Sequence, residues 1–172
     1  MGYQLIETIE VGSGGASAIN ITGISQDFID LKFVVSARSS TASNLNRLFF
    51  RFNNDTSTGL VTNWRSLEGT GSAVQSRAQT SGDSEVTLWQ ILPGSTSTAN
   101  TFCNVGIYVS NYTSTGTKAF SVDAVSEQNA SEAWQVLLAG SYSGSSAIDE
   151  INFFSGNFVE NTTVSVYGIT VD

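Results

Sequence analysis

Apolar side chains occur at every second position along much of the chain. The clearest segment lies between residues 29 and 37, where Val34 is the one exception and the apolar set is Ile29, Leu31, Phe33, Val35 and Ala37. Polar side chains such as Asp30 and Lys32 fill positions between them. A period of two is typical of an extended strand with one buried face and one solvated face. The segment therefore predicts a half-buried β-strand.

The same alternation returns in further segments. Its apolar positions are Leu5 and Ile9; Leu48, Phe50 and Phe52; Cys103, Val105, Ile107 and Val109; Phe120, Val122 and Ala124; Trp134, Val136 and Leu138; Ile151 and Phe153; Val164 and Val166. Clusters of Gly, Ser, Thr and Asn separate these segments and favour turns. The spacing predicts about ten to twelve strands in an all-β, antiparallel, two-sheet β-sandwich, with a jelly roll as the preferred version.

The organisation along the chain is simple. No linker, heptad pattern or repeat of fixed period is present, so one domain over residues 1–172 is expected. The segment 126–133 (SEQNASEA) has some helical character, and we interpret it mainly as a loop with room for a short helical turn.

Charge restricts the expected partners. Lys and Arg number 7 against 15 Asp and Glu, which gives a formal net charge of -8. A surface of this sign repels the phosphates of nucleic acids and anionic membranes, so neither is expected as a partner. The first residues lack the basic and apolar regions of a secretory signal, so none is expected. The single cysteine cannot form an internal disulfide, which predicts synthesis in a reducing cytoplasm.

The numbers of histidine and cysteine residues exclude most catalytic and metal-binding arrangements. The chain has no histidine and a single cysteine, Cys103. Without histidine, Ser-His-Asp and Cys-His catalytic arrangements cannot form, and the zinc sites that combine Cys with His are excluded. Cys103 lies at an inward position of its predicted strand, as a small buried hydrophobe does. We therefore expect a protein that is not an enzyme and holds no cofactor or metal.

Carboxylates leave two weaker alternatives open. A pair of carboxylates can hydrolyse glycosides, and the candidates by position are Asp123, Glu127, Asp149, Glu150 and Glu160. Nothing in the sequence pairs two of them across a cleft. Calcium is the other alternative, through Asp27 with Asp30 or Asp83 with Glu85, although no D-x-D-x-D-G loop is present. Solvated faces and loops are the favoured interpretation of all these residues.

Three aromatic residues are candidates for contact with a partner. Trp64 lies in a polar stretch flanked by turns, Trp89 lies on a strand with apolar residues on both faces, and Tyr112 lies at a loop edge. Exposed aromatic rings on a β-sandwich can stack on sugars or anchor another chain. The favoured alternative is packing beneath a loop or in a subunit interface.

Several segments resemble a known group of proteins. They are YQLIETIEVGSGGASAINITGISQDFIDLKFVVSARSS at the start, LFFRFNNDTS with NWRSLEGTGS, ANTFCNVGIYVSNYTSTGTKAFSVDAVSE, and SGNFVENTTVSVYGITV near the end. Together they look like small virion structural proteins of tailed bacteriophages from marine and cyanobacterial hosts. The resemblance covers nearly the whole chain, and it is a pattern of strands and loops without a catalytic motif.

The resemblance implies a structural role on the surface of a virion. The leading expectation is a head decoration, cement or capsid-surface protein that binds the major capsid protein and itself, with a trimer as the expected homo-oligomer. The alternative is a tail-fibre or receptor-binding module that contacts glycans on the host surface. No site residue follows from the resemblance.

Overall fold

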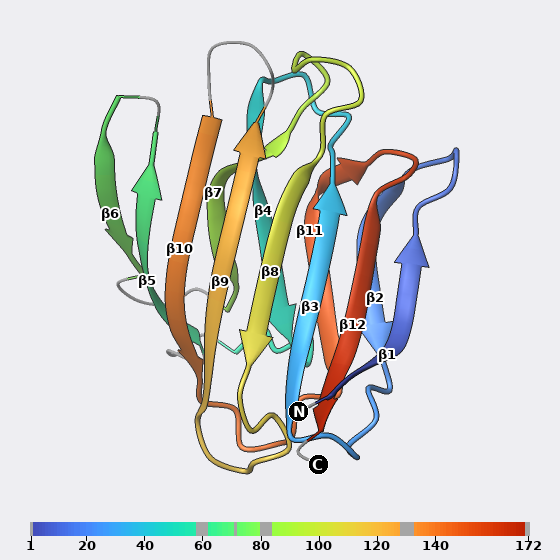
Figure 1. Cartoon of the computed structure of the whole chain (residues 1–172), viewed down its shortest axis with the longest axis vertical. Helices are drawn as coiled ribbons and strands as arrows, with labels where there is room; N and C mark the ends of the chain where they lie inside the picture. Colours follow the sequence, from blue (N-terminus) through green and yellow to red (C-terminus); the bar gives the residue numbers. More distant parts are fainter. Residues whose placement is uncertain (1, 58–61, 71, 80–83, 128–132, 171–172) are drawn as a thin grey trace.

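The computed structural model describes residues 2–57, 62–70, 72–79, 84–127 and 133–170. These residues contain strands and no α-helix (Figure 1). The strands are β1 (Gly2–Glu10), β2 (Ala16–Thr22), β3 (Asp30–Ala37), β4 (Leu45–Phe52), β5 (Thr62–Gly69), β6 (Val74–Ala78), β7 (Val86–Pro93), β8 (Cys103–Val109), β9 (Lys118–Glu127), β10 (Ala133–Tyr142), β11 (Glu150–Phe158) and β12 (Thr163–Thr170). The described part of the chain has no helix long and apolar enough to cross a membrane.

The strands form two antiparallel sheets. The large sheet has eight strands in the order β1-β12-β3-β8-β9-β10-β5-β6, and the small sheet has four in the order β2-β11-β4-β7. The small sheet packs behind one part of the large sheet (Figure 1). The predicted all-β, two-sheet sandwich is therefore confirmed.

Eight of these strands have the connectivity of a jelly roll. Counted in chain order without β5, β6, β9 and β10, the first strand pairs with the eighth, the second with the seventh, the third with the sixth and the fourth with the fifth. These pairs are β1–β12, β2–β11, β3–β8 and β4–β7. The first and last strands consequently lie side by side, with Gly2 opposite Thr170. Two hairpin-like additions, β5–β6 and β9–β10, extend the large sheet beyond β8.

The core occupies the space between the sheets, and it contains the residues that the alternation predicts. Every predicted inward residue of β3, β4, β8, β9, β10, β11 and β12 is buried, Cys103 among them. Val34, the exception in its segment, is exposed on the outer face. Rings of Phe50, Phe52, Phe120 and Phe153 pack against one another across the two sheets. Alternate burial along the strands is therefore what holds the sheets together.

The strand β1 departs from the predicted pattern. A β-bulge interrupts its pairing with β12 between Leu5 and Glu7. The extra residue reverses the alternation, because side chains of a strand change face at every position. Ile6 and Ile9 therefore pack against the core, while the predicted inward residue Leu5 is exposed. Ile29, just before β3, is also exposed and does not belong to the core.

The strands β5 and β6 show no apolar alternation in the sequence, because the inward face of β5 is mostly polar. Its Ser66 and Glu68 are buried. The Glu68 carboxylate accepts hydrogen bonds from the Ser66 hydroxyl at 3.0 Å, from Gln75 Nε2 at 3.0 Å and from Arg77 Nε at 2.7 Å. A buried charge needs such partners, and β6 supplies two of them.

The connection between β9 and β10, residues 128–132, lies outside the described residues. Ser126 and Glu127 end β9, and Ala133 begins β10. The expected loop or helical turn falls largely on residues 128–132, of which the structure gives no description.

We expect the fold to lose stability as the pH rises from about 9 to 12. Burial raises the pKa of the Cys103 thiol from 9.0 and that of Tyr142 from 10.0, each to about 12. A hydrogen bond to Asp30 raises the pKa of Tyr108 from 10.0 to about 12. As the pH rises, these three groups lose their protons in the unfolded chain before they lose them in the folded one. Their contribution to the free energy of unfolding is therefore full below pH 9 and is lost toward pH 12. The lowered pKa of Lys118, caused by burial, opposes this loss in part.

The measurement is the thermal midpoint as a function of pH. With no histidine in the chain, the midpoint should change little between pH 6 and 8. It should then fall toward pH 12, and Cys103→Ala should reduce the early part of that fall. A midpoint that stays constant to pH 12 would contradict the assignment.

Candidate binding surfaces

The structure separates the three aromatic candidates. Trp64 is 5% exposed and Tyr112 is 0% exposed, so both side chains lie in the core. Tyr112 donates a hydrogen bond from its hydroxyl to the carbonyl of Ser25, which ties its loop to the β2–β3 connection. Neither residue is available for a surface contact in this chain. Trp89, on β7, is only partly buried, and it is the candidate that reaches the surface.

The faces of the Trp89 ring are already in contact with arginine. The guanidinium carbon of Arg47 lies 3.3 Å from the ring centroid, and that of Arg77 lies 4.3 Å away. Arg77 comes from β6 and is also bound to the buried Glu68. Trp89 thus joins the edge of the small sheet to the edge of the large sheet through cation–π contacts. A sugar that stacks on this ring would have to displace a guanidinium group.

A hollow of about 420 Å³ lies beside Trp89, and we call it the Trp89 pocket. Its walls come from β4, β7, β11 and the loop before β4, and they include Thr41, Asn46, Arg47, Gln90 and Ser155. No motif in the sequence marks these residues as a site. Only their outward position on the strands, which the alternation gives for Arg47, was visible in the sequence.

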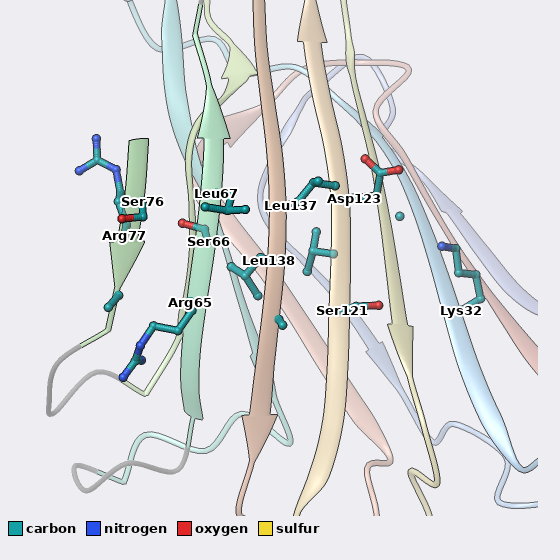
Figure 2. Close-up of a pocket in the computed structure, with 14 residues that line it drawn as sticks. Lys32, Arg65, Ser66, Leu67, Ser76, Arg77, Ser121, Asp123, Leu137 and Leu138 are labelled. Atoms are coloured by element: carbon teal, nitrogen blue, oxygen red, sulfur yellow. The ribbon is translucent and has the colours of Figure 1, made fainter. Parts of the chain in front are cut away.

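A second hollow, of about 690 Å³, lies on the outer face of the large sheet, and we call it the large-sheet groove (Figure 2). Lys32 on β3 and Arg65 on β5 stand toward its two sides. Between them, small residues form the floor, among them Gly106 and Ala139. A Cβ atom on Gly106 would come within 2.8 Å of Lys32 Nζ, so the absence of a side chain there makes room for the ammonium group.

Exposed aliphatic side chains lie on the same face as the large-sheet groove, and two of them, Leu67 and Leu137, line it. The most exposed are Val34, Leu67, Val74, Val125 and Leu137. Leu67 and Leu137 are direct partners on adjacent strands, and both are drawn in Figure 2. The same row continues through Asp123 and Gly106 to Val34. One face of the large sheet therefore carries a row of mostly apolar residues, with Asp123 within it and Lys32 beside it.

The carboxylate candidates do not gather at one place. Asp123 lies on the outer face of the large sheet, whereas Glu150 begins β11 in the small sheet. Asp30 accepts hydrogen bonds from Tyr108 and from the backbone of Asn111, and Asp27 accepts one from Ser25, so both have structural partners. Asp83 is outside the described residues. Within the described ranges, no group of three or more His, Cys, Asp or Glu residues is arranged to hold a metal ion.

Comparisons with known proteins give no family for this chain. No family model matches it, and no curated protein matches it. Among solved structures, that of "Infectious Bursal Virus Derived T=1 Particles" aligns with 10% identity and a TM-score of 0.11. The alignment covers 99% of this chain and 40% of that one. A similarity this low carries no argument about the fold or the function.

Proposed function

We propose that this protein is a non-enzymatic structural protein of a tailed-bacteriophage virion, and that it decorates the outer surface of the head. The observation that carries the proposal is the row of exposed aliphatic side chains beside the large-sheet groove. Jelly rolls recur in particle shells, but they also carry other functions, so the argument rests on this surface and not on the fold.

The apolar row has the properties of a contact between subunits. Leu67 is 56% exposed, Leu137 47%, Val125 45% and Val34 41%. They share one face of the sheet, although Asp123 and Gly106 lie between Leu137 and Val34 along the row. Exposed apolar side chains that gather on one face are typical of a protein interface. Charges of both signs belong to this face, because Asp123 lies within the row and Lys32 lies beside it. A surface with both signs can complement a neighbouring subunit, either another copy or the major capsid protein.

We expect the double substitution Leu67→Asp with Leu137→Asp to weaken self-association by at least about tenfold. Burial of one leucine is worth about 1.5–3 kcal/mol, and 1.4 kcal/mol is a factor of ten. Sedimentation velocity gives the oligomer, which we propose to be a trimer, and its dissociation constant. Leu5→Asp is the matched control, since Leu5 is equally exposed but lies on β1 at the opposite edge of the sheet.

Two outcomes would contradict this interface. One is a wild-type protein that stays monomeric and does not bind purified capsids. The other is equal association of the double variant and the Leu5→Asp control, with far-ultraviolet circular dichroism showing that both are folded. The location itself is tested by mass spectrometry of purified virions and by a particle reconstruction, in which the chain should occupy the outer surface of the head.

The second candidate is a tail-fibre or receptor-binding module that contacts host glycans. The Trp89 pocket favours it, because it is a surface hollow with aromatic, amide and hydroxyl groups on its walls. Binding of the wild-type chain on a glycan array would support this function. Absence of binding to every host polysaccharide tested would count against it.

A further inference from the structure

The Trp89 pocket is produced by two interruptions of the small sheet at one level. In β7, the residues 89–91 stand opposite the single residue Arg47, because Asn46 pairs with Leu92 and Leu48 with Leu88. In β11, pairing with β2 is interrupted between Phe154 and Phe158. These two strands flank β4 on either side. Bulges that re-aim side chains are frequent beside binding sites.

The backbone at these bulges has an uncommon conformation. Gln90 has a φ of 48° and Gly156 a φ of 74°, and both residues line the pocket. Left-handed φ is unfavourable for a glutamine, and surrounding structure must hold it in place. The Ser155 hydroxyl donates to the carbonyl of Arg47, which fixes β11 to β4 at the same level. The hollow is therefore formed by the backbone of the sheet at these bulges.

Arg47 presents an unused set of donors to this hollow. Its guanidinium group lies on the Trp89 ring, and its side chain is exposed. Among the described residues it has no carboxylate partner, whereas Arg51 on the same face is bound to Glu85 at 2.9 Å. Stacking on an aromatic ring leaves the N–H groups at the edge of the guanidinium plane free. These groups match the two oxygens of a carboxylate.

The other walls of the pocket are polar but uncharged. Asn46 directs its Oδ1 to the Ser43 hydroxyl at 2.7 Å, while its Nδ2 is buried without an acceptor in the described part of the chain. Thr41, Gln90 and Ser155 add hydroxyl and amide groups. Because the Asn46 Nδ2 is buried near Gly94, the groups that can meet a ligand are Arg47 and the hydroxyl and amide groups of Thr41, Gln90 and Ser155.

We propose that the Trp89 pocket binds a carboxylated sugar unit, such as a uronic or sialic acid residue of an acidic polysaccharide. Arg47 would hold the carboxylate, and the hydroxyl and amide groups would hold the ring hydroxyls. The volume of about 420 Å³ falls within the range of small-ligand pockets. Although the chain as a whole has a charge of -8, Arg47 attracts an anion locally because it has no carboxylate partner among the described residues. This inference deepens the second candidate function and does not depend on the position of the protein in the particle.

The test is binding of matched oligosaccharides to the full chain by isothermal titration calorimetry. The probe is an oligo-glucuronate or a sialyl-lactose, and the matched control is the neutral oligosaccharide without the carboxylate. We expect the acidic probe to bind at least tenfold more tightly. Arg47→Ala should weaken its binding at least tenfold, and Arg47→Lys should also weaken it, because lysine lacks the planar pair of donors. Arg51→Ala, which alters a paired arginine on the same face, should change it less than threefold.

Each alternative result overturns the proposal in a distinguishable way. Equal binding of the acidic and neutral sugars removes the role of the carboxylate but leaves a glycan-binding function. If a folded Arg47→Ala variant binds the acidic probe as well as the wild-type chain does, the ligand binds at another site. Binding of an oligo-glutamate peptide without binding of either sugar identifies an acidic protein as the ligand. Absence of binding to every glycan tested defeats both this proposal and the second candidate function.

Discussion

Replacing Phe50 by alanine is expected to lower the free energy of unfolding by about 3–5 kcal/mol, the usual effect of removing a buried phenylalanine. Phe50 lies on β4 at the centre of the core and is fully buried. Its ring lies 5.5 Å from that of Phe52, 5.9 Å from Phe120 and 6.0 Å from Phe153, measured between centroids. These rings come from both sheets, so the cavity would open where the sheets are joined. Urea unfolding followed by tryptophan fluorescence measures the loss.

The neighbouring residue supplies the control for this variant. Phe49 has the same side chain on the same strand, but it faces outward and stacks on Phe154 at 5.4 Å. Phe49→Ala should lower the free energy of unfolding by about 1 kcal/mol. The Phe49 ring is only partly removed from water, and the substitution removes one aromatic pair. Equal losses for Phe49→Ala and Phe50→Ala would mean that the alternation of faces along β4 is not what stabilises the fold.

Replacing Arg38 by alanine is expected to lower the free energy of unfolding by about 2–4 kcal/mol. Arg38 follows β3 and is buried, and its guanidinium group donates to the carbonyls of Ser97 at 3.1 Å, Thr98 at 2.7 Å and Thr101 at 3.0 Å. Removal of the guanidinium group takes one charged donor from each of these carbonyls, and hydrogen bonds to a charged group are among the stronger ones. Hydrogen–deuterium exchange should therefore rise in the loop that contains residues 97–101.

A second arginine tests whether burial is the cause. Arg65 also makes hydrogen bonds, to Asn63 Oδ1 at 2.7 Å and to the carbonyl of Trp64 at 2.8 Å, but its side chain is exposed. Water can replace these hydrogen bonds, so Arg65→Ala should lower the free energy of unfolding by less than about 1 kcal/mol. If Arg38→Ala proved equally mild and the exchange of its loop were unchanged, the loop would be held by other contacts.

The fold could be predicted from the sequence where one face of a strand is apolar and the other polar. Strand β8 is the clearest case, because its inward residues from Cys103 to Val109 are all buried as predicted. Prediction failed where another force determines the burial. In β5 the inward Glu68 is compensated by Arg77 on another strand, a pairing that the sequence does not display. In β1 a single bulge reverses the faces after Leu5, and no residue type marks it.

The candidate sites were less accessible to sequence reasoning. The polar stretch around Trp64 predicts a surface contact, but the polar residues on its side of β5, such as Ser66, are themselves buried. The Trp89 pocket depends on bulges in β7 and β11, and Gln90 carries no sequence signal for its positive φ. Sites made by strand register require the pairing of distant segments, which one sequence does not reveal.

The pairing of β1 with β12 has a consequence for how the chain is made. During translation β1 leaves the ribosome long before β12, the strand that lies beside it in the described sheet. At about 5–20 residues per second, the nascent chain would wait roughly ten to thirty seconds for that partner. Over this interval the hydrogen-bonding groups of the first strand have only water, or the strands of another nascent chain, to bind.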